Sequence, residues 1–138
     1  MASSKAHITG MAGEFFVMEK LFRLGHEASL TFGNAKNIDI FTKSHSGKIY
    51  EVSVKAIRGG GKWGIGKTKY SKHINLIFTL LHYKNFENLN SIPDVWVIPA
   101  PKAENIKLPW FENYAIYCSN EEHRLKIEKY RDAWKFFK

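Results

Sequence analysis

Apolar residues recur at steps of three and four near the start of the chain, which is the spacing of an amphipathic helix. The residues that follow this spacing are Ile8, Met11, Phe15, Met18 and Phe22, and Val17, Leu21 and Leu24 widen the stripe. We therefore predict a helix over residues 7–25 with this stripe turned toward the core. Glu14 stands three residues after Met11 and four before Met18, so we expect its carboxylate to point from the buried side. A glutamate at the edge of an apolar stripe can also simply pair with a lysine, and the helix alone does not assign it a role.

Two apolar-rich runs, residues 38–42 and 48–57, flank the polar tetrapeptide SHSG, and this pattern predicts a β-hairpin. Side chains alternate between the two faces of a strand. In the second run Glu51, Ser53 and Lys55 therefore share one face, opposite the face formed by the tyrosine and the valines.

Two charged residues of this hairpin are unusual for their positions. Asp39 lies between two isoleucines, and Lys55 comes near the end of a valine-rich run. Strand interiors disfavour both aspartate and lysine, and a charge held near a core needs a partner or a metal ion. The hairpin is therefore where we expect the chemistry of the protein.

The rest of the chain predicts further strands and one more helix. The expected elements are strands at 27–32, 74–83, 94–99 and about 114–118, a turn at 33–37, and a helix from Asn120 in which Leu125, Ile127, Tyr130, Trp134 and Phe137 form the apolar face. The order of helix, strands and helix favours an α/β fold in which helices flank a mixed sheet.

The composition sets the broad class of the protein. A chain of 138 residues with 44% hydrophobic content suffices for one domain, which we expect to span residues 1–138. The formal net charge of +8 suits a nucleic-acid partner, although a merely soluble basic surface has the same signature. No run approaches the ~18 apolar residues of a membrane span, and one cysteine excludes an internal disulfide. We expect a cytoplasmic protein without a membrane partner.

Residues 61–68, GKWGIGKT, match the phosphate-loop pattern of nucleotide-binding proteins. That site also requires a helix that begins at Lys67 and an acidic residue after a later strand. Trp63 and Ile65 alternate with small residues as in a strand, and the later apolar run ends in His82 and Tyr83. Nucleotide binding through this loop is therefore the weaker alternative.

Glu14, Asp39, Ser53 and Lys55 together form a set with a chemical meaning. Carboxylates and a backbone carbonyl that meet at one point form an oxygen-lined site for Mg²⁺ or Mn²⁺. A nearby lysine can stabilise the charge that develops on a phosphate, or orient the attacking water. This equipment suits the hydrolysis of a phosphodiester bond.

The order of these motifs resembles the PD-(D/E)XK nuclease superfamily, and in particular its small bacterial members. A helix glutamate and an aspartate precede VSVKA at 52–56, and Trp63, an apolar strand and PDVWVIP at 93–99 follow. The resemblance spans nearly the whole chain, including EKYRDAWKFF near its end. It implies a restriction endonuclease-like three-layer core with a mixed sheet flanked by helices, and a magnesium- or manganese-dependent endonuclease that acts on DNA.

The same resemblance implies roles for individual residues. Asp39 would be the metal-binding acid, Lys55 the active-site lysine and Glu14 the helix acid, and the carbonyl of Val54 would be a further metal ligand. Ser53 departs from the pattern, because the family normally has Glu, Asp or Gln two residues before the lysine. Either Glu14 or Glu51, which lies one strand period away, could compensate. The alternative is an inactive nucleic-acid-binding protein on the same fold.

A basic, glycine-rich stretch follows the hairpin directly, and we expect it to contact phosphates. Its candidate nucleic-acid-binding residues are Arg58, Lys62, Lys67, Lys69 and Lys72, with Trp63 available to stack on a base. A solvated charged loop would have the same composition. A homodimer is open as well, since the resemblance includes nucleases that cut two strands.

Overall fold

The computed structural model describes residues 4–31 and 38–138. The elements in chain order are α1 (Lys5–Arg23), β1 (Glu27–Leu30), β2 (Ile40–Lys43), β3 (Ile49–Ile57), β4 (Lys62–Gly66), β5 (Leu76–His82), β6 (Asp94–Pro99), α2 (Ala100–Ile106), β7 (Leu108–Trp110), β8 (Asn113–Tyr117) and α3 (Glu121–Ile127), followed by 3-10 turns at Glu128–Tyr130 and Trp134–Phe136. The predicted turn at 33–37 lies outside the described residues.

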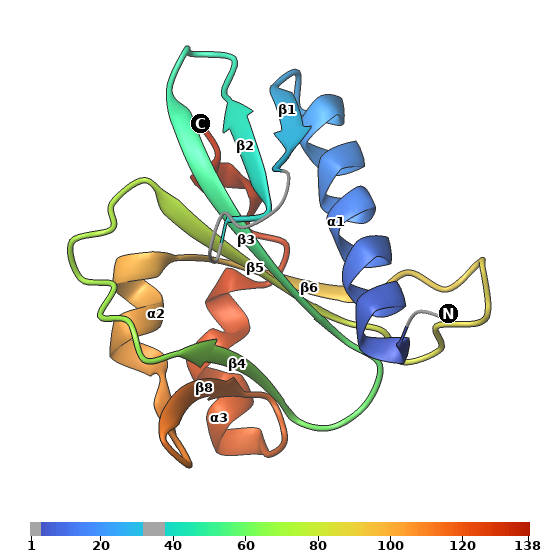
Figure 1. Cartoon of the computed structure of the whole chain (residues 1–138), viewed down its shortest axis with the longest axis vertical. Coiled ribbons are helices and arrows are strands. Elements are labelled where there is room, and N and C mark those ends of the chain that lie inside the picture. The colour runs from blue at the N-terminus through green and yellow to red at the C-terminus, as the bar shows by residue number, and fades with distance from the viewer. Residues whose placement is uncertain (1–3, 32–37) are drawn as a thin grey trace.

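A five-stranded mixed sheet in the order β1-β2-β3-β5-β6 forms the centre of the molecule (Figure 1). Its neighbouring strands are antiparallel except β3 and β5, which are parallel. Parallel neighbours need a crossover connection, and here the crossover contains β4, which belongs to a second sheet of order β4-β8-β7.

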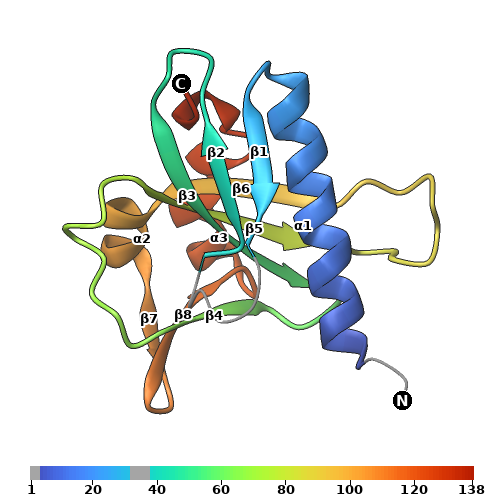
Figure 2. The same ribbon diagram turned by 45° about the horizontal axis from the view of Figure 1, so that its top comes forward.

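The two faces of the central sheet are covered differently, which gives a three-layer arrangement. Alternate residues of β5 and β6 pack against α1 and the C-terminal segment on one face, and against β4, β8, α2 and the region after α3 on the other. Figures 1 and 2 show α1 along one side, with the β4-β8 sheet below the central strands. This confirms the predicted α/β class with helices on a mixed sheet.

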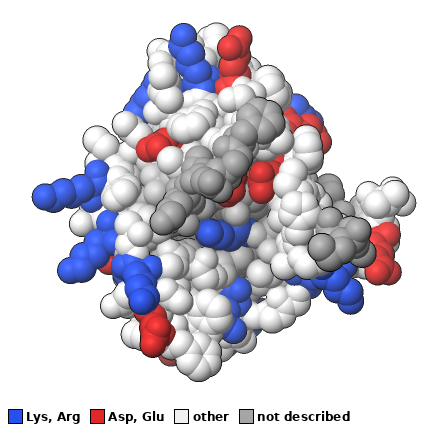
Figure 3. Space-filling model, in the orientation of Figure 1, with Lys and Arg blue, Asp and Glu red and all other residues white. Residues whose placement is uncertain are grey.

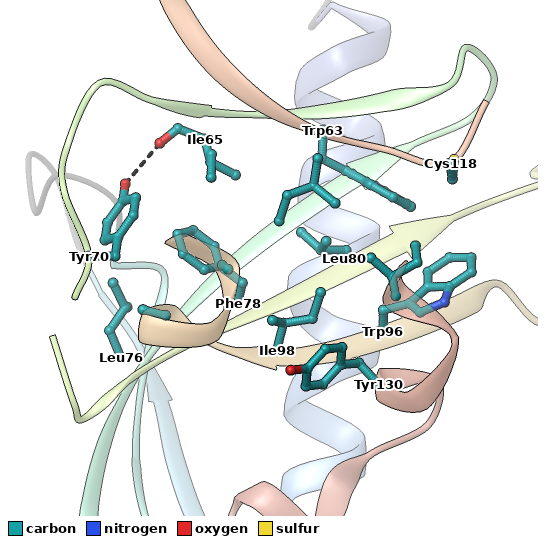
Figure 4. Close-up of a cluster of buried hydrophobic side chains, with 14 residues drawn as sticks. Trp63, Ile65, Tyr70, Leu76, Phe78, Leu80, Trp96, Ile98, Cys118 and Tyr130 are labelled. Carbon is teal, nitrogen blue, oxygen red and sulfur yellow. Dashed lines mark hydrogen bonds between the residues drawn. The ribbon is translucent and has the colours of Figure 1, made fainter. Parts of the chain in front are cut away.

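Aromatic side chains fill the layer under the second sheet (Figure 4). Trp63 of β4 lies with its ring centroid 5.3 Å from that of Trp96 in β6. Tyr70 packs edge to face on Phe78, and its hydroxyl donates a hydrogen bond to the Ile65 carbonyl. The residues between β4 and β5 are thereby attached to the central sheet.

The predicted hairpin is present, with β2 and β3 joined by a turn at 44–47. The Gly47 N–H donates to the Ser44 carbonyl, and Gly47 has φ of 93°, a conformation that glycine adopts without strain. The predicted strand at 94–99 is β6. The strand predicted at 74–83 is shorter, and Ile74 is exposed.

The predicted inward stripe of α1 was right for Val17 and Leu21 and wrong for Ile8, Phe15 and Phe22. The buried residues of the helix are Thr9, Gly13, Val17 and Leu21, whereas Phe15 is 58% exposed and points outward. This happens because α1 lies directly on β3. A Cβ atom added to Gly13 would be only 2.9 Å from the Ala56 Cβ, so this position of the helix has room for glycine alone.

The predicted C-terminal helix was too long. α3 ends at Ile127, Leu125 is exposed, and the chain continues through two 3-10 turns. Asp132 has φ of 51°, which no helix allows, and its N–H donates to the Val95 carbonyl of β6. The last residues therefore follow the sheet, where the Phe137 ring is buried.

Within the described ranges, no helix has the length and apolar character needed to cross a membrane.

Candidate active site

Asp39 lies at the start of β2, where the β2–β3 ladder is irregular. Its N–H donates to the Val52 carbonyl at 2.8 Å, although the ladder already pairs Val52 with Ile40. Two residues of one strand thus face one residue of the other, which is the arrangement of a β-bulge. A bulge redirects a side chain, and the Asp39 Oδ2 atom accepts a hydrogen bond of 2.7 Å from the Val54 N–H.

The backbone of Val54 faces the same space as the Asp39 carboxylate. The N–H and C=O groups of one strand residue point to the same side, and those of Val52 and Val54 are directed toward β2. Because β2 begins at Ile40, the Val54 carbonyl is directed past the end of that strand. The structure thus places a carboxylate and a backbone carbonyl at one edge of β3.

Glu14 reaches this edge from α1. The helix is held against β3 at Gly13, the residue before Glu14, and the glutamate side chain is half-buried. Burial, followed by the charge of Asp39, raises the pKa of Glu14 from 4.5 to about 7. Two carboxylates that repel each other in a partly desolvated place are a setting in which a cation is favourable.

The three other predicted site residues lie on β3 itself. Ser53 is completely buried, and its Oγ atom has no hydrogen-bond partner among the described residues. Lys55 is half-buried two positions further along, and no carboxylate of the described residues forms an ion pair with it. Glu51 lies between Phe41 and Leu76 in the ladder. The Glu51 side chain forms no hydrogen bond or ion pair with Asp39, Glu14 or any other described residue.

The donor set of this edge fits a hard divalent cation. Glu14 and Asp39 provide carboxylate oxygens, and Val54 provides a carbonyl. The described residues contain no cluster of three or more Asp, Glu, His or Cys side chains, so water would complete the coordination. In the view of Figure 3, acidic atoms lie near the middle of the molecular surface, and a basic side chain lies below them.

The prediction that Trp63 stacks on a nucleic-acid base was wrong. Its side chain is 1% exposed, and its Nε1–H donates to the Leu81 carbonyl at 2.9 Å. The indole belongs to the core between the two sheets because β4 folds back over β5. A local reading of the glycine-rich stretch could not show this long-range contact.

Arg58 is engaged within the protein. Its Nε–H donates to the Thr9 Oγ1 atom at 2.7 Å, and its guanidinium lies 3.7 Å from the centroid of the Phe86 ring. These contacts join the end of β3 to α1 and to the segment after β5. These contacts give Arg58 a structural role, in addition to its positive charge at the surface.

The predicted lysines lie on β4 and on the segment that follows it. Lys67, Lys69 and Lys72 are exposed on the segment after β4, and Lys62 is partly exposed on β4. The Lys62 ammonium lies 5.0 Å from the centroid of the Trp110 ring. These side chains are available to an anionic partner.

The phosphate-loop alternative has no structural basis in this fold. Residues 62–66 form the strand β4, and the residues from Lys67 to Tyr70 that follow it are not helical. No helix N-terminus is present there to bind a phosphate. The alternation of Trp63 and Ile65 is confirmed as that of a strand.

Two positioning residues were missed by the sequence reasoning. Gly13 allows the close contact of α1 with β3, and its place directly before Glu14 was the available signal. Thr31 follows β1, and its N–H donates to the Asp39 carbonyl oxygen at 2.9 Å while its Oγ1–H donates to that of Ile38 at 2.7 Å. Thr31 thereby fixes the backbone of the bulge, and no spacing in the sequence indicated this role.

The mixed sheet, the helix along one face and the acids gathered at the edge of β3 define the restriction endonuclease-like class of fold. No family model and no curated protein matches the sequence. The structure is similar to that of the bacterial homing endonuclease I-Ssp6803I, with a TM-score of 0.61 and 14% identity over 95% of this chain and 90% of that chain. It is also similar to Hjc, a Holliday junction resolvase from Archaeoglobus fulgidus, with a TM-score of 0.52 and 12% identity over 78% of this chain and 83% of that chain.

At these identities the likeness concerns the fold. It confirms the predicted restriction endonuclease-like class of fold.

Proposed function

We propose that the protein is a metal-dependent endonuclease that hydrolyses phosphodiester bonds in DNA. The observation that carries the proposal is the place of Glu14, where burial and then the charge of Asp39 raise its pKa to about 7, beside a carboxylate held by the Val54 amide. A purely structural acid pair would normally be offset by a lysine or arginine, and no described ion pair involves either acid.

The chain's own groups divide the work at this edge. Asp39 keeps a fixed orientation because one oxygen accepts the Val54 N–H, which leaves the other carboxylate oxygen for a cation. Glu14 and the Val54 carbonyl complete the protein's part of the site. A Mg²⁺ or Mn²⁺ ion held there would supply a water of lowered pKa and would stabilise negative charge on the phosphate.

Lys55 is the cationic residue of β3 beside this edge. Its ammonium provides three donors that can hold the attacking water or a non-bridging phosphate oxygen. The exposed lysines after β4 hold the DNA backbone, in keeping with the net charge of +8.

An inactive nucleic-acid-binding protein is the second candidate, and one observation favours it. Ser53 stands where the resembling family has a further acid, and the described residues gather two acids at this edge, not three. A neutral hydroxyl contributes little to the binding of Mg²⁺. This candidate predicts salt-sensitive binding without cleavage.

Cleavage assays separate the two candidates. Wild type, Asp39→Ala and Lys55→Ala are incubated with supercoiled plasmid and with a four-way junction, in Mg²⁺, Mn²⁺ or EDTA. The nuclease proposal expects nicked or linear products from the wild type only, and none in EDTA. Exposed Glu87→Gln is the matched acidic control and should cut like wild type.

If wild type binds these DNAs but cuts neither in any metal, the inactive binder is the correct reading. If both site variants cut as fast as wild type, any cleavage originates elsewhere, and the assignment of Asp39 and Lys55 is wrong.

A further inference from the structure

The hairpin formed by β7 and β8 ends in an exposed aromatic residue. Phe111 is 93% exposed, and its φ of 53° is the left-handed conformation that glycine and asparagine adopt more easily. In Figures 1 and 2 the hairpin protrudes from the lower end of the molecule. The chain thus accepts both backbone strain and apolar exposure at one position, a combination that concentrates at functional sites.

Trp110 provides a rigid base for this tip. A Cβ atom added to Gly64 would lie 2.8 Å from the Trp110 ring, so the indole rests directly on the backbone of β4. The Phe111 ring centroid lies 6.0 Å from that of Trp110, with 57° between the ring planes. The tip is therefore held in place, and Phe111 remains free to contact another molecule.

The tip carries charges of both signs. The Lys62 ammonium lies 5.0 Å from the Trp110 ring centroid, and the Lys107 ammonium lies 4.1 Å from that of Tyr114. Lys107 also pairs with Glu104 at 2.9 Å, and exposed Glu112 follows Phe111, so Lys62 is the cation at the tip without a described carboxylate partner.

We propose that this hairpin tip is a contact for unpaired nucleic acid, in which Phe111 stacks on an exposed base and Lys62 binds the adjoining phosphate. The inference deepens the proposed function and rests on it, because it assumes that DNA is the ligand. Aromatic side chains beside a basic surface are the usual means of binding single strands, and stacking tolerates any base sequence. The ligand class is DNA with unpaired or unstacked bases.

A nucleic acid suits the tip better than a protein partner does. A protein interface has a fully buried apolar core, whereas here a single exposed ring projects from a tip that also carries Lys62 and Glu112. Base stacking needs only one free ring face and a nearby cation. The tip provides both.

Binding without cleavage tests this inference. A labelled single strand, a bubble duplex and a continuous duplex are titrated in EDTA with wild type, Phe111→Asn and Phe111→Ala. Asparagine suits the positive φ, so Phe111→Asn should fold at least as stably as wild type. We expect about a tenfold loss of affinity for the single strand and the bubble, and a smaller loss for the continuous duplex.

Two further variants complete the test. Leu89→Ala removes a side chain that is 96% exposed on another loop, and it should bind like wild type. Lys62→Ala should weaken binding and reduce its salt dependence. 2-Aminopurine placed in the single strand should be quenched by wild type and not by Phe111→Asn.

The possible results are distinguishable. Folded Phe111 variants that bind the single strand as wild type does would overturn the inference and leave the proposed function standing. A wild type that binds none of the DNAs would overturn both. If the Phe111 variants differ from wild type only in self-association, measured by analytical ultracentrifugation, the tip is a protein contact and the inference fails.

Discussion

The Asp39 carboxylate lies close enough to Glu14 to add its charge to the effect of burial, and together they raise the pKa of Glu14 to about 7. Without a cation, Glu14 is therefore partly protonated near neutral pH. A divalent ion must displace that proton, so ion binding, protein stability and pH are linked at this one place.

Glu14 makes the metal-free protein less stable as the pH rises. Because its folded pKa is above the ordinary value of 4.5, the folded chain holds this proton more tightly than the unfolded chain does. That stabilising contribution is complete below pH 4.5 and is lost as the pH rises through about 7. We expect Glu14→Gln to be more stable than wild type at pH 8 in EDTA, and thermal melts measure this.

Exposed Glu87→Gln provides the control for these melts, and its pH profile should follow that of wild type. Added Mn²⁺ should stabilise wild type more at pH 8 than at pH 5.5, and should have little effect on Glu14→Gln. Identical pH profiles of Glu14→Gln and wild type would show that the pKa of Glu14 is not raised in the folded protein.

Asp39→Asn separates the charge of this residue from its hydrogen bond. The asparagine carbonyl can still accept the Val54 N–H, so the fold should be retained, and loss of repulsion should leave the stability in EDTA unchanged or higher. Cleavage in Mg²⁺ should fall by ~100-fold or more, since one metal-binding charge is lost. A variant that melts like wild type and still cuts at the wild-type rate would contradict the site.

The sequence predicted the candidate site through local patterns that survive folding. Alternation identified the faces of β3, and β6 was predicted with its observed bounds because its apolar run is bracketed by prolines. The bulge that redirects Asp39 was beyond this reasoning, because a bulge depends on the backbone of two paired strands. The second sheet was missed because its strands are short and β4 is far from β7 and β8 in sequence.

The helix shows where periodicity misleads. Both its inner stripe and its outer stripe carry apolar residues, and the larger side chains, including Phe15 and Phe22, lie outside. The large apolar side chains of the outer stripe led to the prediction that this side faces the core. Close packing on β3 instead requires the smaller residues Thr9 and Gly13 on the inner side. Backbone proximity, which the sequence does not encode in hydrophobicity, decided the orientation of α1.

Two glycine variants on the helix test this explanation. Gly13→Ala places a Cβ 2.9 Å from that of Ala56, so α1 must shift, and we expect a loss of about 1–3 kcal/mol of stability together with weaker Mn²⁺ binding through Glu14. Gly10→Ala has nothing within 4 Å of its new Cβ and should stabilise the helix by up to ~1 kcal/mol. Denaturant titrations that gave both variants the same sign would contradict the close packing at Gly13.

Trp63→Phe tests the burial of that indole. The change removes the indole hydrogen bond to the Leu81 carbonyl and leaves a space where the larger ring lay, which should cost about 1–3 kcal/mol of stability. Affinity for DNA, measured below the melting temperature, should stay at the wild-type value because the residue does not reach the surface. A stable Trp63→Phe protein with weakened DNA binding would restore the stacking role.

Ser53→Ala asks whether the serine that replaces a family acid takes part in the site. The Ser53 Oγ atom is buried and has no hydrogen-bond partner among the described residues, so its removal should leave the stability in EDTA unchanged or slightly higher. If the hydroxyl binds a water of the metal, the affinity for Mn²⁺ should fall several-fold, and calorimetric titration measures this. Thr79→Val is the matched control, because Thr79 is equally buried but donates to the Ser53 carbonyl. It should lower stability and leave Mn²⁺ affinity intact, so an equal effect of both variants on Mn²⁺ binding would show that Ser53 acts only through packing.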